Sequence, residues 1–251
     1  MTIGIGFRCA DGIVLVADQQ ISYGTYYKKY ECKIFTHNTS DWAIGMIYSG
    51  DPELMRVVDE KFTEAMVNTY QSKKPGTASE IKKLLEKTLS GMKTLDAAQD
   101  PEGFYMLCGV VIPNKEMALI RTERKKVREV KELSSYVGIG DSSVLQYLTK
   151  ILVANNNVLN AKQAMYIGVY LTVQAKAYIH ACGGETDSMI LKQNGDIEPH
   201  VHQYNEEQQV LRLEFSLTKM LSVISDPSKP DAEFDSAFEK CRIYSKNMRL
   251  R

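Results

Sequence analysis

The sequence predicts an α+β fold, a four-layer αββα sandwich of two antiparallel sheets flanked by helices. Along the chain, groups of strand-like segments alternate with pairs of helix-like segments. Grouped strands and helix pairs are typical of two sheets packed face to face, whereas a doubly wound parallel sheet would alternate strands and helices singly. The apolar runs, such as residues 13–17, are also short, well under the roughly 20 residues that a membrane span needs.

The first half of the chain opens with strands and continues with helices. Residues 3–9 and 12–18 are predicted as strands around the turn Ala10-Asp11-Gly12, and residues 31–36 and 42–48 as two more. We expect these four strands to form one antiparallel sheet. Apolar residues at helical spacing then predict a helix over 52–70. The segment Thr77-Ala78-Ser79-Glu80 resembles a capping box and predicts a second helix to about Leu95.

The second half repeats this order. Strands are predicted over 103–112, 116–121 and 126–137, followed by helices over about 142–154 and 161–180. A strand pair spans 187–202 and turns at Asn194-Gly195, and helices are predicted from 205 to about 225 and over 231–247. We therefore expect one domain over residues 1–251, with a C-terminal helical extension at about 205–251.

Composition excludes several classes of protein. The 31 basic and 31 acidic side chains give a net charge of zero, which argues against a protein that mainly neutralises nucleic-acid phosphates. The five cysteines are widely spaced, without a CxxC pair, and the N-terminus lacks a basic and apolar signal sequence. These features predict a reduced cytoplasmic protein, without nucleic-acid or membrane partners.

The first residues offer a candidate nucleophile. The chain begins Met1-Thr2, and removal of an initiator methionine before a small residue is sterically easy. The mature chain would then begin with a threonine that carries both a hydroxyl nucleophile and a free α-amine. Because the reference pKa of an α-amine is about 7.7–8.0, this amine can act as a general base near neutral pH.

Two charged residues are expected beside Thr2. If strand 3–9 folds back onto 12–18, Asp18 lies at a strand end next to the N-terminus, and Lys33 follows in a strand expected to be a neighbour. A lysine between a hydroxyl and a carboxylate would stay cationic and would lower the pKa of the hydroxyl. Taken singly, an aspartate after a strand is usually a turn residue and a lysine is usually solvated.

Together these residues resemble the proteasome β-type subunits and their bacterial homologues. The resemblance is strongest over residues 2–60 and rests on Asp18, Lys33 and Ser49-Gly50-Asp51; it continues at residues 137–142 and at Cys182-Gly183-Gly184. The chain also starts directly on the first strand, as β-type subunits do. The resemblance implies an N-terminal-nucleophile (Ntn) hydrolase fold.

The resemblance also implies roles for individual residues. Thr2, Asp18 and Lys33 would be catalytic, and Gly50 would supply the backbone N–H of the oxyanion hole. Ile47 is the alternative residue for the oxyanion position. Asp141 and Cys182 stand where the family pattern has serines that support the site, and Ile179 stands where it has an aspartate. No metal or organic cofactor is implied. His200 and His202 could share one strand face and bind a metal, but exposed strand histidines are the simpler interpretation.

The implied function is that of a threonine peptidase subunit in a closed assembly. Its partners would be peptides or unfolded proteins and further copies of the chain, in a homo-oligomeric ring or another closed assembly. An ATP-dependent unfoldase as a further partner is left open. We expect truncation at Tyr204 to disturb assembly, because residues such as Val210, Phe215 and Leu221 could bind a neighbouring subunit. The alternatives are a catalytically inactive structural subunit of the same fold and an Ntn amidase that acts on a small amide.

Overall fold

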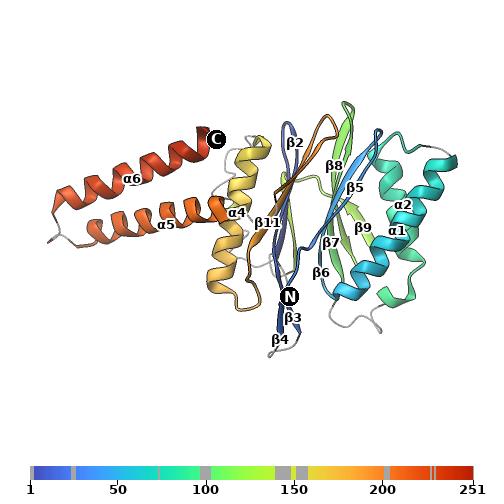
Figure 1. Cartoon of the computed structure of the whole chain (residues 1–251), viewed down its shortest axis with the longest axis horizontal. Coiled ribbons are helices and arrows are strands. Elements are labelled where there is room, and N and C mark those ends of the chain that lie inside the picture. The colour runs from blue at the N-terminus through green and yellow to red at the C-terminus, as the bar shows by residue number, and fades with distance from the viewer. Residues whose placement is uncertain are drawn as a thin grey trace.

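The structure is a computed structural model of the chain. It describes residues 3–23, 27–72, 74–96, 103–138, 148–150, 158–200, 204–226, 228 and 230–250. Figure 1 shows two sheets side by side, with helices on both outer sides. The predicted α+β class with antiparallel sheets is confirmed.

The first sheet contains five antiparallel strands in the order β10-β1-β2-β11-β12. Its central strand β2 (Gly12–Asp18) pairs with β1 (Ile3–Arg8) and β11 (Thr186–Lys192). The edges are β10 (Ser134–Gly138) beside β1 and β12 (Ile197–His200) beside β11. Strands from both ends of the sequence therefore surround β2.

The second sheet also contains five antiparallel strands, in the order β5-β6-β7-β8-β9. These are, in chain order, β5 (Ile34–Asn38), β6 (Ala43–Ser49), β7 (Tyr105–Ile112), β8 (Glu116–Glu123) and β9 (Lys126–Glu129). A separate ribbon consists of β3 (Gln20–Tyr23) and β4 (Tyr27–Tyr30), in a segment where the sequence predicted no strand.

Two strand predictions are wrong in their pairing. The first four predicted strands do not form one sheet, because β1 and β2 lie in the first sheet while β5 and β6 lie in the second. The single strand predicted over 126–137 is two strands, β9 and β10, in different sheets. Apolar periodicity indicates that a strand has a buried face, but it does not say which sheet provides the cover.

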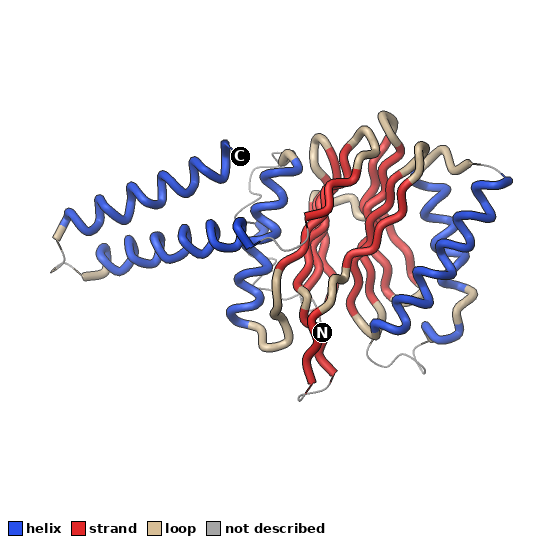
Figure 2. The backbone as a smooth tube through the Cα atoms, in the orientation of Figure 1, coloured by secondary structure: helices blue, strands red, loops and turns tan. Residues whose placement is uncertain are grey.

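Helices cover the outer face of each sheet (Figures 1 and 2). The helices α1 (Pro52–Ser72) and α2 (Ala78–Ser90) and the short 3₁₀ turn η1 (Lys93–Leu95) lie on the second sheet. The Thr77 side chain accepts a hydrogen bond from the Glu80 N–H at the start of α2. The first sheet is covered by α4 (Ala161–Tyr178), which a capping box of Asn160 and Gln163 begins. Of the helix predicted over 142–154, residues 148–150 are helical and the others lie outside the described residues.

Strand β2 shows how the layers are built. All seven of its residues are buried. Ile13, Leu15 and Ala17 belong to the cluster between the two sheets, whereas Val14 and Val16 pack in the cluster beneath α4. Because side chains alternate across a strand, a strand with both faces covered is apolar at nearly every position.

Paired glycines let the two sheets approach closely. Gly45 on β6 lies opposite Gly109 on β7. A Cβ atom at Gly109 would lie 2.8 Å from the Ile13 side chain of the other sheet, and one at Gly45 would collide with Met189 of β11. Side chains of the first sheet thus occupy the space that side chains at Gly45 and Gly109 would otherwise fill.

Two further helices form a hairpin at the C-terminal end. They are α5 (Tyr204–Ile224) and α6 (Asp231–Leu250), and they extend away from the sheets beyond α4 (Figure 1). That they form an extension of a single domain stays a prediction. None of the helices in the described ranges has the length and apolarity that crossing a bilayer requires.

The packing of α1 provides a test of the core. Val58 is fully buried, whereas Val67 of the same helix is 50% exposed. We expect Val58→Ala to lower the free energy of unfolding by about 2 kcal/mol, because two buried methyl groups are lost and a cavity remains. Val67→Ala is the matched control and should change it little. Equal effects in urea unfolding would show that α1 does not pack against the second sheet as described.

Candidate functional site

Asp18 is a buried carboxylate at the end of β2. Its Oδ1 atom accepts hydrogen bonds from the backbone N–H of Ile3 at 3.1 Å and from Lys33 Nζ at 2.8 Å. Its Oδ2 atom accepts from the Gly183 N–H at 3.0 Å. A buried charge is tolerated only when it is paired and hydrogen-bonded. Asp18 therefore holds the start of β1, the start of the second sheet and the loop before β11 at one point.

Lys33 reaches Asp18 from the opposite sheet. It directly precedes β5, and its side chain is as completely buried as that of Asp18. Its Nζ atom also donates to the Gln20 carbonyl at 2.5 Å. Burial lowers the pKa of Lys33 below its usual range, while the Asp18 carboxylate opposes that shift. The ammonium is therefore held by two acceptors but is easier to deprotonate than a solvated lysine.

The structure brings together the predicted residues Asp18 and Lys33, with Cys182 close by. Thr2 and Asp141 lie outside the described residues, so their positions stay predictions. Lys33 was expected in a strand beside β1 and β2; it lies instead just before the edge strand of the other sheet. The contact is therefore between sheets, not within one.

Cys182 is buried just before the Gly183-Gly184 turn. Burial, with a contribution from the Asp18 carboxylate, raises the pKa of its thiol to about 12. A thiol with such a pKa is protonated at neutral pH, and the thiolate is the nucleophilic form. Cys182 is therefore a poor nucleophile, and its supporting role stays a prediction. Ile179, where the family pattern has an aspartate, packs against the apolar cluster under α4.

The Gly183-Gly184 turn is fixed on several sides. The Gly183 carbonyl accepts from the backbone N–H groups of Gln19 and Gln20, at 3.2 and 3.0 Å. Gly184 has a φ of +72°, which favours glycine. A Cβ atom there would lie 2.6 Å from the Tyr30 ring. The turn that binds Asp18 is thus held against the chain segment whose Gln20 carbonyl binds Lys33.

Asp187 is a buried acid near the site that the sequence analysis missed. It lies on β11 opposite Ala17, and both of its carboxylate oxygens accept from Gln19 Nε2, at 3.0 and 3.1 Å. Its charge favours the protonated form of Lys33 and so acts to raise its pKa. The available signal was a carboxylate in a strand that continues into the apolar run Met189-Ile190-Leu191, because a buried acid requires a partner.

Gly50 lies at the same end of the sheets as the ion pair. It follows β6, and the register that sets Ile34 opposite Ile47 puts Gly50 beyond the end of β5 where Lys33 lies. Gly50 has a φ of +127°, a conformation that favours glycine. Ile47, the alternative residue for the oxyanion position, is buried between the sheets. The oxyanion role of Gly50 stays a prediction.

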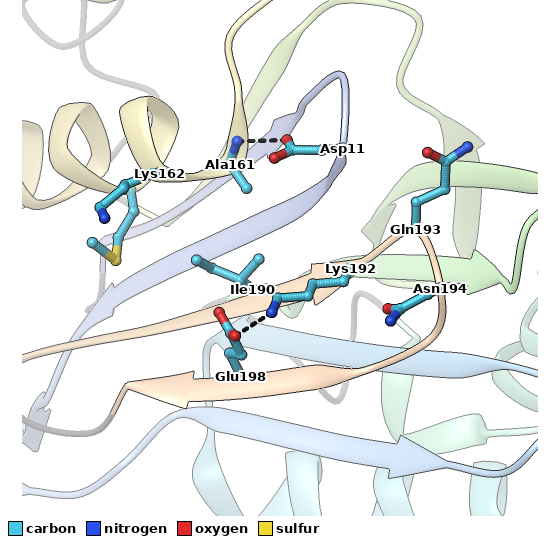
Figure 3. Close-up of a pocket in the computed structure, with 9 residues that line it drawn as sticks. Asp11, Ala161, Lys162, Ile190, Lys192, Gln193, Asn194 and Glu198 are labelled. Atoms are coloured by element: carbon cyan, nitrogen blue, oxygen red, sulfur yellow. Dashed lines mark hydrogen bonds and ion pairs between the residues drawn. The ribbon is translucent and has the colours of Figure 1, made fainter. Parts of the chain in front are cut away.

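A cavity lies at the end of β2 that is opposite to Asp18 (Figure 3). It has a volume of about 430 Å³ and is lined by residues that include Asp11, Lys162, Lys192 and Glu198. Asp11 accepts a hydrogen bond from the Ala161 N–H at 2.7 Å, and Lys192 forms an ion pair with Glu198. None of the lining residues is a hydroxyl or thiol nucleophile, so we do not assign this cavity to the site.

The described residues contain no group of three or more potential metal ligands. Of the two strand histidines, His200 ends β12, while His202 lies outside the described residues. The charges of Asp18 and Lys33 allow an electrostatic role. A fixed ammonium beside a carboxylate can stabilise negative charge on a neighbouring oxygen atom.

Fold and site together define a class of protein. In this class two antiparallel sheets pack face to face, and a buried lysine–aspartate pair contacts the start of the first strand. Among solved structures, those of Anbu proteins have this fold. The Anbu Gly-1 mutant from Hyphomicrobium sp. strain MC1 matches with a TM-score of 0.73 at 12% identity, over 90% of this chain and 100% of that one. Anbu (ancestral beta-subunit) from Yersinia bercovieri matches with a TM-score of 0.70 at 12% identity, over 91% and 98%.

A third match is a helical assembly of the Anbu complex from Pseudomonas aeruginosa. Its TM-score is 0.64 at 13% identity, over 92% of this chain and 99% of that one. No protein-family model matches the chain. No curated protein matches it either. At such identities the similarity establishes the fold.

The predicted family is corrected by these matches. The sequence pattern indicated a proteasome β-type subunit, but the matching structures are Anbu proteins, which form a distinct family. The pattern could not distinguish the two families because it consists of strand ends, a buried ion pair and a glycine turn. Such features are requirements of a shared fold and do not separate families that have it.

The buried pair provides a test of the site geometry. We expect Lys33→Met to lower the free energy of unfolding by about 3–5 kcal/mol, because it leaves Asp18 charged, buried and without its cation. Adding Asp18→Asn to the same chain should recover part of this loss. Lys74→Met is the control, since Lys74 forms an exposed ion pair with Asp41 and its loss should have little effect. A Lys33→Met variant as stable as the wild type in urea would contradict the burial of this pair.

Proposed function

We propose that the chain is an N-terminal-nucleophile hydrolase of the threonine peptidase type, with the four-layer αββα sandwich of that class. Thr2 would be the nucleophile once Met1 is removed. The observation that carries the proposal is the hydrogen bond from the Ile3 N–H to Asp18 Oδ1. Ile3 follows Thr2 in the chain, so the buried ion pair binds the residue next to the proposed nucleophile.

In the proposed mechanism, the Thr2 hydroxyl oxygen attacks the substrate carbonyl and its proton passes to the α-amine. Lys33 stabilises the developing negative charge, and Asp18 orients Lys33. The N–H of Gly50 is the proposed oxyanion donor. The tetrahedral intermediate expels the leaving amine, which takes the proton, and an ester remains on Thr2. Water, deprotonated by the α-amine, then hydrolyses the ester and restores the hydroxyl.

Asp141 and Cys182 are proposed as supporting residues of the same site. Cys182 is buried next to the Gly183 N–H that binds Asp18, so it can position that contact by packing. An aspartate such as Asp141 could hold the ammonium form of the α-amine. The cytoplasmic location stays a prediction.

We further propose that the chain assembles with copies of itself through α5 and α6. Six of the large apolar side chains on these helices are at least 43% exposed, namely Leu211, Phe215, Leu221, Ile224, Phe238 and Ile243. Large apolar side chains left exposed along two neighbouring helices are a feature of interaction sites. A second copy is the proposed occupant because one matching structure is a helical assembly of the Anbu complex. The proposed substrates are peptides or unfolded proteins.

The nucleophile is tested by intact mass before and after exposure to a peptide epoxyketone. This reagent closes a ring with both the hydroxyl and the free α-amine of an N-terminal threonine. We expect loss of Met1 and one adduct per chain, and no adduct in Thr2→Ala. Loss of Met1 without an adduct would favour the inactive structural subunit. Turnover of small amides without cleavage of peptides would favour the amidase.

Assembly is tested by native mass spectrometry. We expect the double variant Phe215→Ser/Phe238→Ser to form smaller oligomers than the wild type, because the two side chains are 72% and 54% exposed on α5 and α6. Tyr178→Ser is the control, since Tyr178 is 80% exposed but lies at the end of α4. Unchanged oligomer mass in the double variant would contradict assembly through this surface.

A further inference from the structure

Lys176 connects α4 with the glycine turn, with β11 and with α5. It lies near the end of α4, and its Nζ atom donates to the Gly184 carbonyl and to Thr186 Oγ1, both at 3.0 Å. A third hydrogen bond goes to Glu207 of α5. An ammonium has three donors, so these three acceptors use all of them. The side chains of Lys176 and Glu207 are 14% and 15% exposed.

Two of these contacts lie directly next to Asp18. Gly184 follows Gly183, whose N–H donates to Asp18 Oδ2 at 3.0 Å. Thr186 is the residue of β11 that lies opposite Asp18 of β2, and it is fully buried. Lys176 therefore holds the glycine turn on one side of the Asp18 contact and the paired strand on the other.

The third contact comes from the C-terminal hairpin. Glu207 lies in the first turn of α5, at the point where Figure 1 shows α5 meeting α4. Val210, one turn further along α5, is buried in the cluster between α4 and the first sheet. The start of α5 is thus docked on the body, while six large apolar side chains further along α5 and on α6 are exposed.

We infer that Lys176 is a positioning residue, which couples the docking of α5 to the geometry of Asp18 through the Gly183-Gly184 turn. With α5 docked, Glu207 and Lys176 hold the Gly184 carbonyl and the Thr186 hydroxyl, and Gly183 presents its N–H to Asp18. Without Glu207, the Lys176 ammonium loses its only anionic partner of the three and the turn is held less firmly. Contacts that α5 and α6 make in an assembly are in this way transmitted to the proposed catalytic pair.

The test uses hydrogen exchange of the full-length chain, read at residues 180–186. We expect Lys176→Met to raise exchange of the Gly183 amide about tenfold, the effect of losing roughly one hydrogen bond to a charged group. Glu207→Gln should change exchange in the same direction by less, because its oxygen still accepts but no longer carries charge. Lys162→Met on α4 and Glu206→Gln on α5 are the matched controls. Unchanged exchange in Lys176→Met would overturn the inference, and unchanged exchange in Glu207→Gln would overturn the link to α5.

A kinetic measurement adds the part that rests on the proposed function. If Thr2 is the nucleophile, Lys176→Met should lower the saturating rate constant of epoxyketone addition about tenfold, with little change in the concentration at half saturation. An unaltered rate constant in a variant with faster Gly183 exchange would overturn the positioning role. If the wild type forms no adduct, the proposed function fails, while the exchange measurement still decides whether Lys176 couples α5 to the turn.

Discussion

A single buried carboxylate constrains the arrangement of this molecule. Asp18 is fully buried, and a buried charge must be satisfied by donors that the fold brings to it. Those donors are the N–H groups of Ile3 and Gly183 and the ammonium of Lys33. They belong to the first strand, the turn before β11 and the start of the second sheet, so none can shift without exposing or orphaning the charge. The apolar clusters stabilise the layers, and Asp18 fixes the relative positions of their ends.

The second sheet contributes to this constraint through close packing. Met189 of β11 occupies the space beside Gly45 of β6, and Ile13 of β2 occupies the space beside Gly109 of β7. Because interiors pack at nearly crystalline density, the two sheets have little freedom to slide. Lys33, which enters from the edge of the second sheet, therefore reaches Asp18 in one geometry.

The local elements could be predicted from the sequence, but most of the pairing could not. Periodicity indicated the strands around β2 and the helices α1, α2 and α4, because each has an apolar face that repeats at its own period. It could not show that β10 pairs with β1 or that β5 and β6 belong to the second sheet. Such pairing depends on contacts between residues far apart in the chain. The ribbon β3–β4 was missed because its sequence does not alternate between apolar and polar residues.

The candidate site divides in the same way. Asp18 and Lys33 could be found because their types and spacing match a known pattern, even though the family that this pattern suggested was wrong. The contacts of Gln19, Asp187 and Lys176 could not, because each joins residues of different elements. Such supporting residues carry no local signal beyond a polar side chain within a buried element. These residues can be identified only when the structure shows which residue each of them contacts.

The buried pair itself bears on the choice between an enzyme and an inactive subunit. Replacing a buried ion pair with well-packed apolar residues is often neutral or stabilising, so stability alone does not require one. In this chain the pair is fully buried, and burial lowers the pKa of Lys33, a cost to the charged state. A structural subunit of this fold could fill the same space with apolar side chains. This chain instead carries an ammonium oriented by Asp18, and the same carboxylate accepts from the N–H of Ile3, the residue after Thr2. This arrangement supports a chemical use for the charge.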